Sequence, residues 1–248
     1  NLPEIGIRLK WAFGVSLITA LLLPLALGRW SGLAAFGLWL ALWIFAATMV
    51  NLWSRLRPLP VSGLVARLRA LPLGYLGMLT AHVGVAVFIT GVTLVKTYES
   101  EKDVQMDIGD TVTMGPYTFK FNGVTSGARE NYLYARGAFE VSRNGHVVTT
   151  MSPEKHQFVV SKGEPSTVAA INRGFTRDLY VALGEQDGSS PTAWVVRVYY
   201  KPFVDWIWGG CLVMAIGGVL ALSDRRYRFA RSTARDVAEP TLSATAPA

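Results

Sequence analysis

The sequence has few charged residues and few of the side chains that bind metals or form disulfides. Only 17% of its 248 residues are charged, whereas soluble domains average about 25%. It contains one cysteine, Cys211, and three histidines. An internal disulfide, a CxxC redox pair and a cysteine-based zinc site are therefore excluded. Walker, nucleophile-elbow and HExxH motifs are also absent, so an NTPase or a hydrolase has no support.

Acidic residues are nearly missing from the first part of the chain. Before Lys96 the only acid is Glu4, whereas twelve of the seventeen acids lie between Glu99 and Asp187. This sorting predicts one part in lipid and another in water. The net charge of +7 does not indicate nucleic-acid binding, because the arginines flank apolar runs and form no basic face with interleaved aromatic residues.

Four apolar runs are long enough to cross a bilayer, which takes about 20 residues. They are Trp11–Leu27, Gly32–Leu52, Gly74–Val95 and Phe203–Leu222. Pro24 lies near the end of the first run, where a lost backbone hydrogen bond costs least. Tryptophans near the run ends, among them Trp206 and Trp208, are typical of interfacial anchors. We therefore predict a polytopic α-helical membrane protein with four transmembrane helices.

Arginines predict the orientation of these helices. Basic residues crowd the loop 53–73 and the tail 224–248, and loops rich in arginine and lysine stay in the cytoplasm. The predicted domains are three helices in 1–96, a non-cytoplasmic domain in 97–201, a fourth helix in 202–223 and the cytoplasmic tail. The end of that tail, after Asp236, has too few apolar residues to fold and is expected to be disordered.

Residues 97–201 show the two-residue alternation of β-strands. Val104, Met106 and Ile108 alternate with polar residues, as do aromatic residues from Tyr117 onward, which is strand patterning. Asn144-Gly145 is typical of a type I′ hairpin turn. Further strands are expected at 156–160, 179–183 and 193–199, and a short helix at Pro165–Asn172. The inserted domain is predicted to be a small antiparallel β-barrel or sandwich.

His82 is the only histidine within an apolar run. An ionisable residue in the bilayer is a candidate functional residue, and a neutral imidazole suits iron. The alternative is a neutral histidine bonded to a neighbouring helix. Gly77, Gly84 and Gly91 form a small-residue stripe that permits close helix packing, and at about 100° per residue His82 lies well off that stripe.

Two further histidines and one arginine–aspartate pair show no clear ligand pattern. His146 and His156 have no Cys, Asp or His partner at metal-ligand spacing, so both are interpreted as surface residues. The arginine and aspartate of TRDLYVALGE, Arg177 and Asp178, fit a solvated turn beside a strand.

Three long segments together resemble one known family. LTAHVGVAVFITGV, GFTRDLYVALGE and AWVVRVYYKPFVDWIWGGCLVMAIGGVLALSDRRYR follow one another and resemble the carboxyl-terminal third of the CcmF family, the haem lyase subunit of cytochrome c maturation. The resemblance extends from about Lys10 to Arg228, and homologues that serve nitrite reductase maturation share it. After PEK, where the family has a basic residue and an aromatic pair, this chain has His156, Gln157 and Phe158.

The resemblance implies a bacterial inner-membrane haem lyase with its β-domain in the periplasm. Such an enzyme takes haem from the CcmE chaperone and joins it to the CxxCH motif of apocytochrome c, together with CcmH/CcmI-type subunits. It carries haem b between two transmembrane histidines. His82 matches one of them, as an axial ligand to the haem iron, while the second ligand and the tryptophan-rich WWD haem site are expected upstream. No complete catalytic site is implied within this chain.

The competing hypothesis is a non-catalytic membrane scaffold or transport subunit whose β-domain binds a partner.

Overall fold

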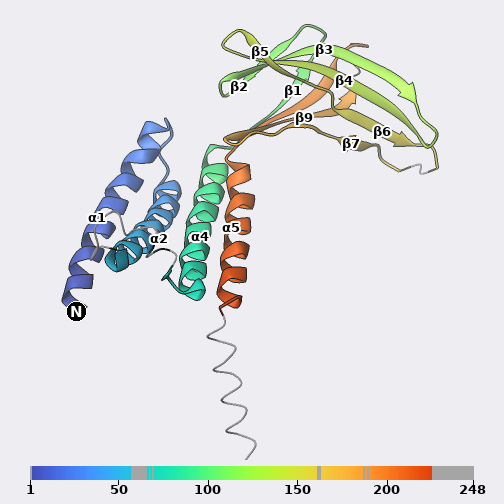
Figure 1. Cartoon of the computed structure of the whole chain (residues 1–248). Coiled ribbons are helices and arrows are strands. Elements are labelled where there is room, and N and C mark those ends of the chain that lie inside the picture. Colours follow the sequence, from blue (N-terminus) through green and yellow to red (C-terminus); the bar gives the residue numbers. More distant parts are fainter. Residues whose placement is uncertain are drawn as a thin grey trace, which may run out of the picture. The chain divides into compact units, whose positions relative to one another are not determined.

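The chain folds as a helical unit and a β-unit (Figure 1). We describe them from a computed structural model, whose described residues are 2–56, 66, 68, 70–160, 163–186, 188 and 190–224. The helical unit comprises Asn1–Thr93 and Trp206–Ala248, and the β-unit comprises Leu94–Asp205. Most of the predicted basic loop 53–73 and the predicted disordered tail lie outside the described residues.

Four of the described helices are long and apolar enough to cross a membrane, as the sequence predicted. They are α1 (Leu2–Ala26), α2 (Gly32–Leu56), α4 (Leu73–Tyr98) and α5 (Val204–Leu222). Pro24 lies in the last turn of α1, which ends at Ala26, so the interruption of the backbone hydrogen bonds comes where the helix stops. Asp224 follows α5, and its Oδ2 accepts a hydrogen bond from the Gly74 amide at 2.9 Å. This bond satisfies one of the free N–H groups at the start of α4.

Helices α4 and α5 approach each other through glycine, as the small-residue stripe predicted (Figure 1). A Cβ atom added to Gly84 would lie 2.6 Å from the Met214 backbone nitrogen. One added to Gly217 on α5 would lie 2.5 Å from the Ala81 nitrogen. No side chain fits such a gap, so glycine is required on both helices for this backbone contact.

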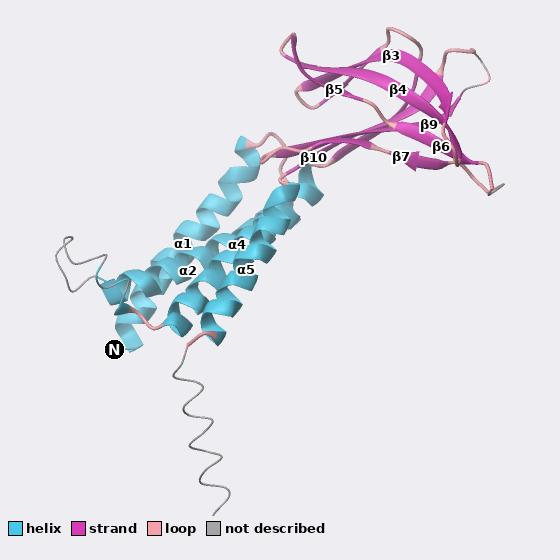
Figure 2. Ribbon diagram, turned by 45° about the vertical axis from the view of Figure 1, so that its right-hand side comes forward, coloured by secondary structure: helices cyan, strands magenta, loops and turns pink. Residues whose placement is uncertain are grey.

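The β-unit consists of two antiparallel sheets (Figure 2). One sheet has the strand order β1-β10-β9-β8, and the other β2-β3-β4-β6-β7, with β5 paired to β4. In chain order the strands are β1 (Ser100–Met106), β2 (Thr111–Met114), β3 (Tyr117–Ala128), β4 (Tyr132–Arg143), β5 (His146–Met151), β6 (Glu154–Phe158), β7 (Ser166–Val168), β8 (Ala170–Asn172), β9 (Arg177–Gln186) and β10 (Trp194–Pro202). The predicted antiparallel domain is thus confirmed, in its sandwich form.

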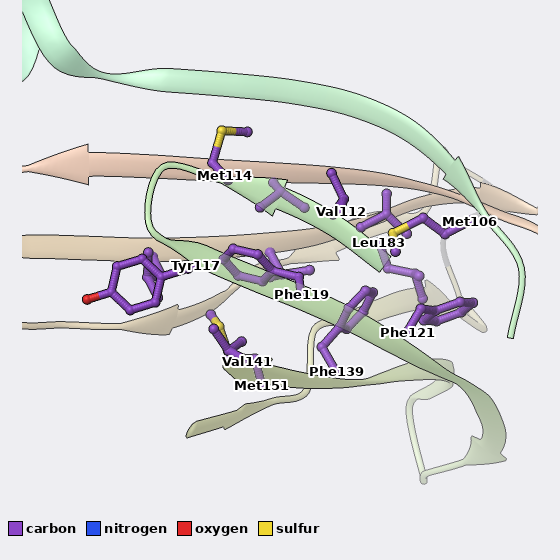
Figure 3. Close-up of a cluster of buried hydrophobic side chains, with 14 residues drawn as sticks. Met106, Val112, Met114, Tyr117, Phe119, Phe121, Phe139, Val141, Met151 and Leu183 are labelled. Atoms are coloured by element: carbon purple, nitrogen blue, oxygen red, sulfur yellow. The ribbon is translucent and has the colours of Figure 1, made fainter. Parts of the chain in front are cut away.

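Large apolar side chains from both sheets meet in one core (Figure 3). Phe119, Phe121 and Phe139 of β3 and β4 are at most 1% exposed, and Leu179 and Val196 of β9 and β10 are fully buried. Successive side chains of a strand point to opposite faces, so the alternation seen in the sequence places one apolar face of each sheet inside. The rings of Phe121 and Phe139 lie 5.0 Å apart, which adds aromatic contact to burial.

The turns and strand edges test the finer predictions. Asn144 and Gly145 have φ angles of 52° and 80°, which confirms the predicted hairpin turn between β4 and β5. The predicted helix at Pro165–Asn172 is wrong. This segment forms β7, which pairs with β6, and β8, which pairs with β9. The short segment gains more backbone hydrogen bonds by joining two sheet edges than from a single helical turn, whose nucleation is costly.

Candidate functional site

His82 lies on the face of α4 that is directed toward α2. It lines a groove of about 300 Å³ between the two helices. The groove is mostly apolar, with side chains from α2 and α4: Trp43, Ile44, Ala47, Thr48, Asn51, Met78, Leu79 and His82. The glycine stripe faces α5 instead, so α4 packs closely on one side and presents its imidazole on another, as the spacing predicted.

The imidazole of His82 is held by its own helix. Nδ1 lies 2.8 Å from the carbonyl oxygen of Met78, one turn earlier. Because a carbonyl oxygen only accepts hydrogen bonds, Nδ1 must carry the proton. In the neutral form of the ring, Nε2 is then the unprotonated nitrogen, which is the arrangement of a histidine metal ligand whose other nitrogen is oriented by a backbone carbonyl. His82 is also exposed within the helical unit, so its side chain is accessible to a ligand.

Polar side chains lie about two turns from His82, where α2 and α4 again face each other. The Tyr75 hydroxyl donates to Asn51 Oδ1 at 2.6 Å. The guanidinium carbon of Arg55 lies 4.2 Å from the centre of the Tyr75 ring, within the range of a cation–π contact. Asn51 belongs to the lining of the groove that contains His82. Asn51 therefore connects the groove of His82 to the hydrogen-bonded pair that it forms with Tyr75 and to the guanidinium of Arg55.

His156 is not the isolated surface residue that the sequence suggested. Its Nε2 lies 2.7 Å from Glu154 Oε2, and its ring stacks on Tyr132 at 4.2 Å. Arg136 Nε donates to the other carboxylate oxygen of Glu154 at 2.6 Å. The His156 hydrogen bond, followed by Arg136, outweighs partial burial and lowers the pKa of Glu154. The i, i+2 spacing of Glu154 and His156 on a strand was the signal that could have identified this pair. His146 is exposed, as predicted.

Arg177 and Asp178 do not form a solvated turn. Asp178 is 2% exposed, and its Oδ1 accepts from the Gly174 amide at 3.1 Å. Arg177 Nε donates to the Tyr117 hydroxyl at 2.9 Å, and Nη1 donates to the Asn172 carbonyl at 3.0 Å. The motif therefore fixes the loop before β9 to the neighbouring strands, which is a structural task.

Among the described residues, no group of three or more His, Cys, Asp and Glu side chains could hold a metal ion. A porphyrin leaves only axial positions of its iron to the protein. The oriented imidazole of His82 and the mostly apolar groove that it lines fit one such position.

Comparison with known proteins identifies the β-domain and the chain around it. The model of the family described as "CcmF C-terminal beta-sandwich" matches residues 97–202. The cytochrome c-type biogenesis protein CcmF of Pseudomonas aeruginosa is 43% identical over 200 residues, which cover 81% of this chain and 29% of that protein. The chain belongs to the CcmF family. CcmF of Escherichia coli is 39% identical over 218 residues, 88% of this chain and 32% of that protein.

Two further proteins are similar to this chain. The cytochrome c-type biogenesis protein NrfE of Haemophilus influenzae is 28% identical over 189 residues, 76% of this chain and 27% of that protein. A solved structure described as "Cytochrome c Heme Lyase CcmF" shares the fold with a TM-score of 0.68 at 20% identity, over 86% of this chain and 34% of that chain. The chain spans about a third of the length of its CcmF relatives.

Proposed function

We propose that this chain is part of a haem lyase of cytochrome c maturation and that His82 is an axial ligand to haem b. The geometry of His82 carries the proposal, because Nδ1 is bonded to the Met78 carbonyl and the residue lines the groove beside α2. Haem b, when bound, would supply one-electron reduction of the haem that is to be attached.

The residues of the groove have distinct tasks in this proposal. The Met78 carbonyl fixes the tautomer and the orientation of the imidazole. Ile44, Ala47 and Leu79 of the groove lining would exclude water and contact the porphyrin plane. Helix α5 holds α4 from the other side through glycine contacts, which limits rotation of His82 away from α2. The second axial ligand would come from outside these 248 residues, because His82 is the only histidine in the four spans.

The surroundings of the site follow from the same proposal. The protein would lie in the bacterial inner membrane, with 1–96 and 202–223 forming the helices, the loop 53–73 and the tail 224–248 in the cytoplasm, and 97–201 in the periplasm. The whole enzyme would transfer haem from CcmE to the CxxCH motif of apocytochrome c and assemble with CcmH/CcmI-type subunits. The catalytic site would be completed by other parts of that enzyme.

Absorbance spectroscopy of the complete purified protein tests the ligand assignment. We expect the wild type, after chemical reduction, to show the absorbance bands of a b-type haem. In His82→Ala these bands should be lost or shifted. The matched control is His146→Ala, since His146 is exposed on the β-domain and its removal should leave the spectrum unchanged. Equal haem content and identical spectra in wild type and His82→Ala would refute the assignment and favour a scaffold.

A further inference from the structure

We infer that Asn51, Arg55 and Tyr75 form a carboxylate-binding subsite that holds the propionate groups of the haem at His82. The inference rests on the proposed function and extends it to three residues that neither the sequence motifs nor the family comparison assign. The helical unit has a hydrogen-bonded and cationic cluster of these three residues, and Asn51 of the cluster also lines the mostly apolar groove that contains His82.

The spacing along the helices places the cluster within reach of one porphyrin. Seven residues separate Tyr75 from His82, which corresponds to about 10 Å along the axis of α4. On α2, Asn51 lies opposite Tyr75, as their 2.6 Å hydrogen bond shows, and Ile44 lines the groove with His82. A haem held by His82 would therefore have Asn51, Arg55 and Tyr75 within reach of its carboxylates.

The donors of the cluster match carboxylates. Arg55 has five N–H donors in a planar fork, which suits a carboxylate with two oxygens. Because Asn51 Oδ1 already accepts from Tyr75, the amide presents its Nδ2 donors to a ligand. The sequences of α2 and α4 contain no acid, and the carboxylate of Asp224, which follows α5, is bonded to the Gly74 amide.

The arrangement of Arg55 differs from what membrane orientation alone requires. An arginine that sets topology needs only to reach the lipid headgroups, and its side chain can adopt many rotamers. Here the guanidinium lies over the Tyr75 ring, and Tyr75 is itself hydrogen-bonded to Asn51. Such a stacked guanidinium is pre-organised, so less side-chain entropy is lost when it binds a carboxylate.

A comparison of haem with its dimethyl ester tests the subsite, because the ester keeps the porphyrin and iron but removes both carboxylate charges. The complete protein would be depleted of haem and titrated with each compound, and the affinity ratio would be measured. Removing a hydrogen bond to a charged group costs about 1.5 to 3 kcal/mol, so we expect Arg55→Ala to weaken haem binding by about 10- to 150-fold. The ester should bind the variant and the wild type alike.

Matched variants separate this effect from a change in fold or charge. Arg55→Lys should keep part of the preference for haem, and Tyr75→Phe should weaken it by about tenfold or less. Lys96→Ala removes one positive charge at the far end of α4, where Lys96 is 76% exposed, and should leave both affinities unchanged. The band positions of bound haem should stay those of the wild type in every variant, because His82 is retained.

The outcomes distinguish failure of this inference from failure of the proposed function. If Arg55→Ala binds haem and the ester with wild-type affinities, or weakens both equally, the inference is wrong while His82 ligation stands. If the His82→Ala spectrum equals that of the wild type, both fail. Loss of discrimination in Arg55→Ala, with the ester unaffected, supports the subsite.

Discussion

Substituting Gly217 by alanine should weaken the contact between α4 and α5. The added Cβ would lie 2.5 Å from the backbone nitrogen of Ala81 and 2.7 Å from the carbonyl oxygen of Gly77. Both are backbone atoms of a helix, so the two helices must separate to make room. Overpacking of this kind typically costs about 1 to 3 kcal/mol.

The adjacent residue on α5 provides a matched control. A Cβ added to Gly218 meets nothing within 4 Å, and Gly218→Ala makes the same chemical change in the same helix. Alanine gains about 1 kcal/mol over glycine from helix propensity in both variants, so the difference between them isolates the steric cost. We expect Gly217→Ala to be less stable than Gly218→Ala by about 1 to 3 kcal/mol.

Detergent-solubilised protein unfolded with dodecyl sulfate gives this difference from the helical circular dichroism signal. A lower unfolding midpoint for Gly217→Ala than for Gly218→Ala is the expected result. Equal midpoints would show that α4 and α5 do not make this glycine contact. An orientation of α4 in which His82 is directed toward α2 would then have no support from the helix packing.

Three predictions concern the β-domain, and each is measured as a change in its unfolding midpoint in the purified protein. Gly145→Ala should destabilise the domain by about 1 to 2 kcal/mol, because a φ of 80° is unfavourable for an L-residue, whereas Gly188→Ala, which adds no contact, should not. Asp178→Ala should cost about 1 to 3 kcal/mol, because the Gly174 amide loses its buried acceptor, and a neutral result would contradict that bond. The pKa of Glu154 is lowered in the folded domain, so its ionised side chain stabilises the fold at pH values above the ordinary glutamate pKa of about 4.3. This stabilisation is lost as the pH falls from that value toward the lowered pKa. Glu154→Gln should therefore make the unfolding midpoint less dependent on pH in the acid range.

Sequence patterns predicted the helices and the two faces of α4 because their physical causes are local. Long apolar runs specify spans, and the recurrence of glycine every seven residues specifies a contact face. The identity of the partner helix needed the structure, since only the backbone contacts of Gly84 and Gly217 show that α5 fills this face. The groove that His82 shares with Ile44 likewise depends on how α2 packs against α4.

The sequence predictions that were wrong in the β-domain concerned residues whose partners are distant in sequence. The segment Pro165–Asn172 resembled a helix start, but its two short strands are specified by β6 and β9. Asp178 resembled a solvated acid because the Gly174 amide and the fold of the loop that bury it are not visible in the local pattern. Arg177 reaches Tyr117, sixty residues earlier, and no local pattern predicts such a contact.

Density at Nε2 of His82 in an electron cryomicroscopy map of the complete protein is the most direct test of the account. We predict continuous density from Nε2 to an iron atom at the centre of a planar macrocycle, which lies in the groove between α2 and α4 with its carboxylates toward Arg55. The Nδ1 atom should remain bonded to the Met78 carbonyl. A map in which another helix fills this groove and hydrogen-bonds to Nε2, with no macrocycle beside it, would contradict the central claim.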